Sequence, residues 1–389
     1  MLPQAKEEAS MARPDRPAPI ETETSGPIQV LATAPGRTVS IFPRWLPKLL
    51  IMIIGLLAFI LALQLLKQGA KVYGGEIIRI LHVSNVANTL GFGWLLAYIF
   101  LSGSPVAAIA VSFFAAGTIT DMQAFTMITG SRLGASFIVL FVGFLYYLRG
   151  HQRSASISIG VLALLTTAAI YLPALAVGYW LLTSGLFGSL QVSATTPVSS
   201  VIDAIYGPIL ELIKSLGLPG WVVFLLGIGA LLGAFNLLDR ALPEMSADRS
   251  SFQRIGRLVY RPMAMFLLGC AVTSVTLSVS VSLSILVPLS AKGLVRRENT
   301  LPYIMGANIT TFIDTLVAAL INGGPAAFTI VLVEMISVAA LSLLVLLLCY
   351  RPFERSILRL QELIIRDNRT LGAFLCIMLI IPVILLLVK

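Results

Sequence analysis

The sequence predicts an all-α polytopic membrane protein built from two inverted-topology repeats, each with a re-entrant hairpin of broken helices. Three observations lead to this prediction. The 389 residues are 57% hydrophobic and 12% charged, with a mean hydropathy of +0.94, whereas about a quarter of the residues of a soluble domain are charged. Two apolar stretches are too long for single spans. An offset of 176 positions relates these two stretches to each other.

Residues 1–46 are the only part that reads as water-soluble. They carry five basic and five acidic side chains, many prolines and glycines, and no apolar run long enough to start a core. The segment also lacks the apolar core and cleavage site of a secretory signal, so we expect a disordered cytoplasmic tail that stays on the protein. Its charges cancel, and the formal net charge of +9 therefore belongs to the membrane part. There it indicates topology and argues against nucleic-acid binding.

The apolar runs predict the membrane elements, because a span needs about 20 predominantly apolar residues. Single spans are predicted at 47–66, 124–148, 157–185, 220–238, 301–322, 326–350 and 371–388. The stretches 84–118 and 262–291 are interrupted by small and hydroxyl residues. A straight helix of 30 residues would be about 45 Å long and would overshoot the bilayer. We therefore expect a re-entrant hairpin in each stretch.

Basic residues predict the orientation. Fifteen of the 22 that follow position 46 fall in four segments, which should be cytoplasmic: Arg149 and Arg153; Arg240, Arg249, Arg254, Arg257 and Arg261; Lys292, Arg296 and Arg297; Arg351, Arg355, Arg359, Arg366 and Arg369. The loop 186–219, with Lys214 as its only base, should be extracytoplasmic. Lys67, Lys71 and Arg79 run against this scheme. Three spans separate the hairpins, so the hairpins should enter from opposite faces.

This layout divides the chain into six parts. After the tail come repeat 1 (47–185), the extracytoplasmic loop (186–219) and repeat 2 (220–350). A basic amphipathic segment (351–370) should lie against anionic lipid headgroups, and a C-terminal transmembrane helix occupies 371–389. The N-terminus is expected in the cytoplasm.

The two repeats share small and polar residues at matched positions. A shift of 176 carries Ser102 onto Ser278, Ser104 onto Ser280 and Gly130 onto Gly306, with no gap. Inverted repeats with broken helices are typical of secondary transporters, whose substrate sites lie near the membrane midplane. The alternative is chance similarity between two apolar segments.

A serine-rich motif followed by GANITT at Gly306 to Thr311 resembles the sodium–phosphate cotransporter family of the type II or bacterial kind. That family has two inverted copies of a QSSS motif, each followed by a GANIGTT-like motif. The resemblance implies a transporter that couples inward sodium flow to uptake of inorganic phosphate. It also implies a location in the plasma (inner) membrane. The chain departs from the pattern in reading LSGS from Leu101 and LSVS from Leu277. In its first GANIGTT equivalent, which begins at Gly130, Arg132 replaces the asparagine.

The candidate binding residues follow from the helix breaks. Freed backbone N–H groups can bind an anion, and freed carbonyls with hydroxyls can hold Na⁺. The predicted substrate and ion site comprises Ser102, Ser104, Ser131, Arg132, Ser278, Ser280, Asn308, Thr310 and Thr311. The alternative for each hydroxyl is a bond back to its own helix. Asn308 either bridges helices or coordinates the ligand.

Arg132, Asp314 and Glu334 are the ionisable residues of the deep apolar spans, where charges normally face a pocket or each other. Three interpretations stay open for Arg132. It clamps the anion with its planar donor fork, it pairs structurally with Asp314 or Glu334, or it occupies the place of a coupling sodium.

Three hypotheses about function stay open. The first is sodium-coupled symport of phosphate or a similar small oxyanion. The second keeps the fold but makes transport sodium-independent, by proton coupling, exchange or efflux. The third is a non-transporting sensor or scaffold. No P-loop and no HExxH motif occurs, so we expect no enzyme and no cofactor other than Na⁺ as coupling ion. The expected partners are the lipid bilayer and a small anion, and the oligomeric state stays open.

Overall fold

The computed structural model describes residues 46–80, 83, 85–148, 153–187, 196–241, 261–284, 286–291 and 295–388. The predicted tail 1–46 lies outside these ranges except for Leu46, and so do the basic residues Arg149, Arg249, Arg254, Arg257 and Lys292. The described part contains helices and no strand. Six candidate membrane-spanning helices are found in it by length and apolar composition, which agrees with an all-α polytopic membrane protein.

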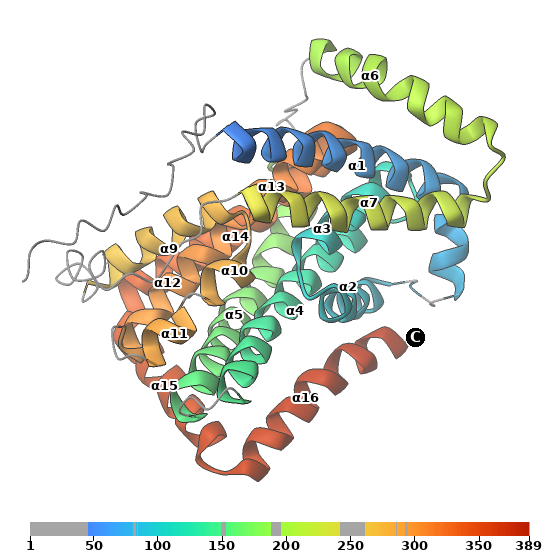
Figure 1. Ribbon diagram of the computed structural model, residues 1–389. Helices are drawn as coiled ribbons and strands as arrows, with labels where there is room; N and C mark the ends of the chain where they lie inside the picture. The colour runs from blue at the N-terminus through green and yellow to red at the C-terminus, as the bar shows by residue number, and fades with distance from the viewer. Residues whose placement is uncertain are drawn as a thin grey trace, which may run out of the picture. The chain divides into compact units, whose positions relative to one another are not determined.

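The helices of the first half are seen in Figure 1 in blue to green. They are α1 (Leu46–Ile80), α2 (Val86–Phe100), α3 (Ser104–Ala115), α4 (Asp121–Leu148), α5 (Arg153–Thr183) and α6 (Thr196–Ser215). The second half begins with α7 (Gly220–Ala241), α9 (Pro262–Thr276), α10 (Val279–Ser284), α11 (Leu286–Ala291), α12 (Arg297–Thr310) and α13 (Phe312–Ala318). A π-helix, η1 (Ala319–Gly323), leads into α14 (Gly324–Leu344), π-helix η2 (Val345–Cys349), α15 (Tyr350–Arg366) and α16 (Asn368–Leu387).

Each predicted hairpin stretch is broken in the middle. Helices α2 and α3 occupy 84–118, and α9, α10 and α11 occupy 262–291. A shift of 176 carries the bounds of α2, Val86 and Phe100, onto those of α9, Pro262 and Thr276. At both breaks a leucine, Leu101 or Leu277, has a φ of 50°, a left-handed conformation that residues other than glycine seldom adopt. The breaks are thus sharp backbone turns of the same kind.

Each hairpin packs closely on the helix that follows it. A Cβ added at Gly130 of α4 would collide with the carbonyl oxygen of Leu90 in α2. The same holds 176 positions later, where a Cβ at Gly306 of α12 would collide with the carbonyl oxygen of Phe266 in α9. Small residues that let two backbones approach are typical of helix interfaces in membranes. Both glycines are therefore explained by this packing.

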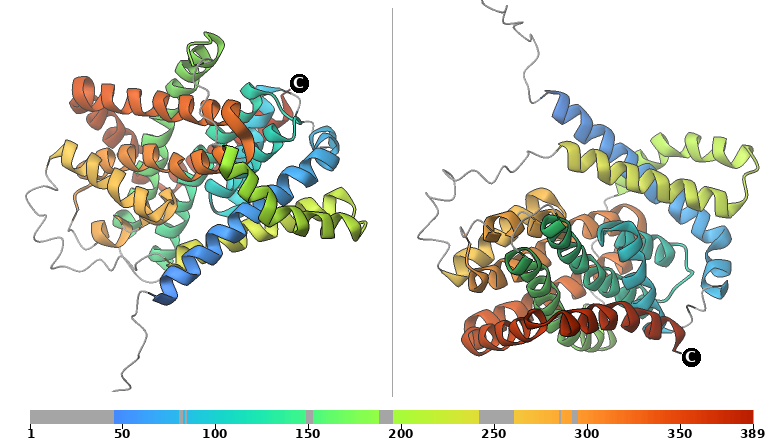
Figure 2. Two further views of the ribbon diagram at one scale, coloured as in Figure 1. Left: turned by 90° about the horizontal axis from the view of Figure 1, so that it is seen from above. Right: turned by 60° about the horizontal axis from the view of Figure 1, so that its bottom comes forward.

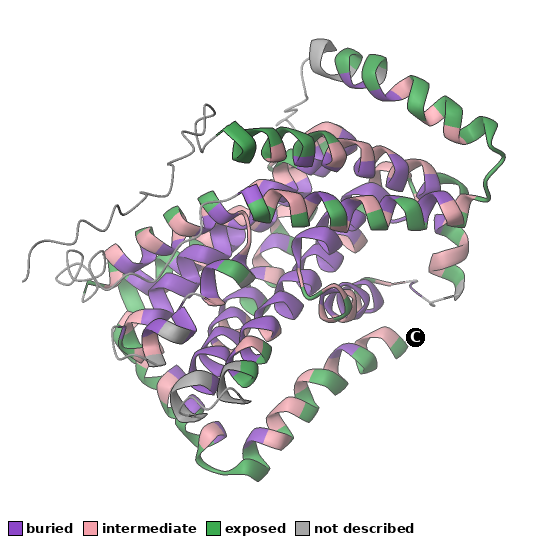
Figure 3. Ribbon diagram, viewed as in Figure 1, coloured by how far each residue is buried: buried purple, intermediate pink, exposed green. Residues whose placement is uncertain are grey.

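Helices α4 and α5 lie at the centre of the packing, and α16 lies at its margin. In the most apolar 18-residue window, 72% of residues are buried in α4 and 61% in α5, against 11% in α16. Figure 3 shows the difference as purple central helices beside a mostly green and pink α16. Figure 2 shows α1 and α7 running side by side, and these two helices are in extensive contact. The exposed apolar side chains of the outer helices suit a lipid environment.

Three elements differ from the predicted ones. Helix α1 continues beyond the predicted span 47–66 as far as Ile80. The predicted span 301–322 is divided at Thr311 between α12 and α13. The predicted loop 186–219 contains helix α6, whose Tyr206 hydroxyl donates to the carbonyl oxygen of Leu57 in α1 (3.0 Å). The basic segment predicted at 351–370 contains α15, which packs on α5 and α16.

Candidate functional site

A buried guanidinium joins the two halves of the chain. Arg132, on α4, is 3% exposed. Its Nη1 donates to Thr311 Oγ1 (3.2 Å), and its Nη2 donates to Thr315 Oγ1 (2.5 Å) and to Asp314 Oδ1 (3.5 Å). Thr311 lies at the division of α12 from α13, and Asp314 and Thr315 lie in the first turn of α13. One cation of the first half is thus surrounded by oxygen atoms of the second.

The ion pair between Arg132 and Asp314 is connected through a hydroxyl. Thr315 Oγ1 accepts from Arg132 and donates to Asp314 Oδ1 at 2.8 Å. The direct contact of 3.5 Å lies at the outer limit of a hydrogen bond, so the threonine supplies the shorter path. Because both side chains are buried, each needs the other to offset the loss of hydration.

Aromatic rings cover one side of the guanidinium. Its central carbon lies 4.8 Å from the centroid of the Phe312 ring, an arrangement in which a cation is attracted to the face of the ring. Phe312 in turn stacks on Tyr171 of α5, with ring centroids 6.3 Å apart. The Tyr171 hydroxyl donates to the carbonyl oxygen of Asn308 (2.9 Å). The aromatic pair therefore ties Arg132 to the retained GANITT motif.

Three charged groups near this point keep an unpartnered buried atom. They are Arg132 Nε, Asp314 Oδ2 and Glu334 Oε2. The other carboxylate oxygen of Glu334, on α14, accepts from Thr129 Oγ1 of α4 at 2.8 Å. Buried polar atoms without a partner are uncommon, and each asks for an explanation such as a ligand. The cluster retains a donor for an anion and two acceptors for a cation.

Both helix breaks lie beside this cluster. A Cβ at Gly103, in the first break, would meet the carbonyl oxygen of Ser131, the residue that precedes Arg132. Leu277, in the second break, lines a cavity of about 270 Å³ together with Asp314. The cavity is bounded mainly by apolar side chains of α1, α7 and α13. The two breaks thus approach the Arg132–Asp314 pair from different elements.

The predicted hydroxyl residues are placed less uniformly. Ser131 Oγ donates back to the Ile128 carbonyl at 2.7 Å, which is the alternative expected for a helical serine. Thr310 Oγ1 donates to the Cys270 carbonyl (3.0 Å) and so ties α12 to α9. Ser278 Oγ accepts from the Val281 N–H (3.3 Å).

The remaining predicted residues contact neither Arg132 nor Asp314 through a described hydrogen bond. Ser102 is half-buried, Ser104 is buried at the start of α3, and the side chain of Ser280 lies outside the described residues. Asn308 Nδ2 donates to Thr167 Oγ1 of α5 (3.0 Å), so its amide bridges two helices. Of the predicted site, the structure brings together Arg132, Thr311 and Asp314, with Glu334 near them.

Thr315, Phe312 and Tyr171 were not predicted from the sequence. Thr315 follows Asp314 directly, so a second oxygen beside a carboxylate in an apolar span was a visible signal. A lone phenylalanine or tyrosine in such a span carries no comparable signal, because aromatic side chains are common in apolar packing. Among the described residues, no group of three or more His, Cys, Asp or Glu side chains is placed to hold a metal ion.

Part of the second half of the chain is similar to a known protein family. Residues 230–359 match the family model described as Na⁺/Pi-cotransporter. The matched segment holds the second helix break, the GANITT motif, Asp314 and Glu334, whereas Arg132 precedes it. No curated protein and no solved structure matches the chain.

Proposed function

We propose, from the match that supports membership of the Na⁺/Pi-cotransporter family, that this multi-pass membrane protein is a secondary transporter of inorganic phosphate or a similar small oxyanion. In this proposal sodium drives symport, and two inverted repeats provide access from alternate faces of the plasma membrane. The N-terminus lies in the cytoplasm. The proposal treats the chain as a transporter and not as an enzyme.

The matched backbone features support the two-repeat part of the proposal. Leu101 and Leu277 share their left-handed conformation, and α2 and α9 share their bounds after the shift of 176. Between the hairpins lie three candidate spans, α4, α5 and α7. An odd number of crossings turns the second hairpin over with respect to the first. Two broken hairpins of opposite orientation are what alternating access by inverted repeats requires.

The contact of Arg132 with Asp314 and Thr315 carries the proposal for the binding step. It joins the halves of the chain through a group that suits phosphate, because a guanidinium presents a planar fork of donors. Arg132 keeps Nε without a partner, and its direct contact with Asp314 is long. An oxyanion at this point would take over donors of Arg132, and so would loosen the contact between α4 and α13. Binding and movement would thus be coupled through one side chain.

Uptake of labelled phosphate by proteoliposomes tests the proposal. We expect accumulation that depends on an inward sodium gradient and collapses when an ionophore dissipates it. Arg132→Ala should abolish uptake, whereas Arg369→Gln, at an exposed position of α16, should leave it unchanged. Phosphate flux that is absent in every cation gradient would reject the proposal.

The oxygen atoms around Arg132 favour a second candidate function, in which transport does not use a sodium ion at the position of Arg132. Thr311 Oγ1, Thr315 Oγ1 and Asp314 Oδ1 form a set of ligands that would also suit a small hard cation, and the guanidinium already occupies it. Arg132→Asn restores the family residue, so sodium dependence should arise or increase. Arg132→Lys keeps the positive charge, so its sodium dependence of transport should equal that of the unchanged protein. An unchanged sodium response in Arg132→Asn would count against this candidate.

A further inference from the structure

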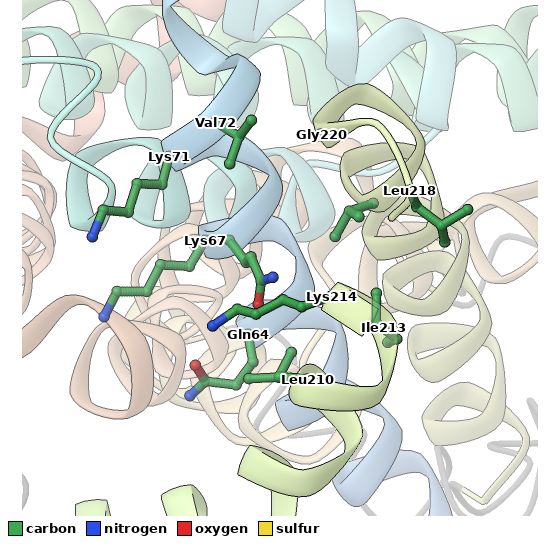
Figure 4. Close-up of a pocket in the computed structure, with 11 residues that line it drawn as sticks. Gln64, Lys67, Lys71, Val72, Leu210, Ile213, Lys214, Leu218 and Gly220 are labelled. Carbon is green, nitrogen blue, oxygen red and sulfur yellow. The ribbon is translucent and has the colours of Figure 1, made fainter. Parts of the chain in front are cut away.

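Three lysines gather at a cavity that is separate from the Arg132 cluster. The cavity has a volume of about 440 Å³ and is bounded by α1, α6 and the start of α7. Lys67 and Lys71 come from α1 and Lys214 from α6, with the amides of Gln64 and Gln68 beside them. Figure 4 shows the three ammonium groups extending to the same side. Leucine, isoleucine and valine side chains form the remaining wall.

No acidic side chain is among the described residues that line this cavity, so its three positive charges have no counter-charge in the described lining. Within the described part of the chain, none of the three lysines is in an ion pair. Like charges in one cavity repel one another, and this repulsion is relieved when an anion binds between them. The arrangement therefore favours a negatively charged ligand.

One of the lysines is held in place. Lys67 is half-buried, and its Nζ donates to the carbonyl oxygen of Asn322 in η1 (3.0 Å). Asn322 is itself fixed, because its amide donates to the Leu63 carbonyl and to Ser112 Oγ (3.1 Å each). An ammonium group has three donors, so Lys67 keeps two for a ligand. Its position is set before any ligand arrives, which reduces the entropy lost on binding.

The cavity lies at the membrane face where basic residues are not expected. Lys67 follows Leu46 by 21 residues of helix, about 30 Å, which is the thickness of the hydrocarbon layer. Helix α7 begins at Gly220 in the cavity wall and ends next to Arg240, in a predicted cytoplasmic segment. The cavity is thus at the end of α7 away from that segment. The positive-inside tendency does not explain bases at this end, whereas an anion ligand does.

We propose that this cavity is an oxyanion-binding vestibule, in which Lys67, Lys71 and Lys214 hold a phosphate-type anion at the membrane face opposite the arginine-rich loops. The vestibule raises the local concentration of the anion before transport, as clefts lined by one sign of charge do. The inference rests on the proposed function only for the identity of the anion and for its later passage. Binding itself is independent of transport.

Protection from acetylation tests the binding directly. The purified chain in a zwitterionic detergent is treated with acetic anhydride at constant ionic strength, in inorganic phosphate or in chloride, and each lysine is quantified by mass spectrometry. We expect phosphate to slow modification of Lys67, Lys71 and Lys214 at least about threefold. Lys48, exposed at the other end of α1, is the internal control and should react equally in both salts. Equal protection of all four lysines, or of none, overturns the proposal.

A double variant tests whether Lys67 binds phosphate when the other two lysines are removed. Lys71→Gln with Lys214→Gln changes two exposed side chains, so folding should be preserved. The phosphate protection of Lys67 should then disappear, and Lys48→Gln should leave it intact. In transporting proteoliposomes the double variant should raise the KM for phosphate about three- to tenfold and leave kcat unchanged. Retained protection of Lys67 in the double variant overturns the proposal.

Two further experiments are needed. One distinguishes free phosphate from a lipid headgroup as the ligand, and the other distinguishes failure of binding from failure of the proposed transport function. Nanodiscs of phosphatidylcholine and of phosphatidylglycerol distinguish free phosphate from a lipid headgroup. Protection by phosphatidylglycerol alone, with no effect of inorganic phosphate, overturns the vestibule for a soluble anion. If the proteoliposomes take up no phosphate in any cation gradient, the proposed transport function fails. The acetylation result in detergent then still decides whether the vestibule binds phosphate.

Discussion

Leu101 and Leu277 adopt the same left-handed backbone conformation, with φ of 50° at both, and stand 176 positions apart in the chain. Each ends the first helix of a hairpin: the Leu101 N–H donates to the carbonyl of Ala97 and the Leu277 N–H to that of Thr273. A side chain in this conformation strains the backbone by about 1–2 kcal/mol. The strain at both breaks indicates that the turn geometry is required, whatever residue occupies it.

The first prediction concerns this strain. Leu101→Gly should raise the free energy of unfolding by up to about 1 kcal/mol because the Cβ conflict disappears, and Leu101→Val should lower it by about 1–2 kcal/mol because β-branched residues tolerate positive φ least. Thermal unfolding in detergent micelles measures both. Ile99→Val, at an exposed position of the regular helix α2, is the matched control and should change the midpoint little. Equal midpoints for Leu101→Gly and Leu101→Val would contradict this account.

The second prediction concerns the close crossing of helices. Gly306→Ala should lower the free energy of unfolding by about 1–3 kcal/mol, since its Cβ meets the Phe266 carbonyl and α9 must move away. Gly130→Ala should have an effect of similar size at the matched crossing. Gly233→Ala in α7, where no atom lies within 4 Å of the added Cβ, should be neutral or stabilising by about 0.5–1 kcal/mol. A destabilising Gly233→Ala with a neutral Gly306→Ala would refute the packing explanation.

The third prediction concerns the buried ion pair. Asp314→Asn should destabilise the protein by about 3–5 kcal/mol, because it removes the carboxylate that is in contact with the buried guanidinium of Arg132. The double variant Arg132→Asn with Asp314→Asn should recover part of that loss. Glu76→Gln, in the exposed Arg79–Glu76 pair, should change stability by less than about 1 kcal/mol.

A double-variant cycle on thermal or chemical unfolding gives the coupling between Arg132 and Asp314. Strong coupling supports a contact that holds α4 to α13. Additive effects of the two substitutions would show that the pair contributes little, and would shift attention to Thr311 and Thr315.

The helix breaks were predictable because they combine two local signals. Each stretch was too long for one span, and serines interrupted it at 102–104 and 278–280, close to the breaks at Leu101 and Leu277. Helix α6 was missed for the opposite reason: a search for uninterrupted apolar runs passes over an amphipathic helix. Hydropathy thus finds the helices that are apolar on all sides, and misses a helix such as α6 that is apolar on one side only.

The residues of the Arg132 cluster were predictable from the sequence, and the pairing among them was not. Charges in apolar spans identified Arg132, Asp314 and Glu334. Which carboxylate lies against the guanidinium depends on how α4 packs on α13 and α14, a long-range arrangement that residue types do not encode one by one. For the same reason Thr315, which shortens the path between Arg132 and Asp314, became visible only in three dimensions.

The tether of Arg132 to α4 has an energetic consequence. A coupling ion that crosses the membrane delivers about 2.3 kcal/mol per elementary charge for every 100 mV of membrane potential. In the proposed transporter, a guanidinium that stays with the protein when the anion leaves would neutralise the anion without carrying current through a full cycle. With Arg132 in the place of one coupling ion, the proposed cycle loses one charge of electrogenic driving force. The steepest anion gradient that such a cycle sustains at 100 mV is then smaller by about fiftyfold.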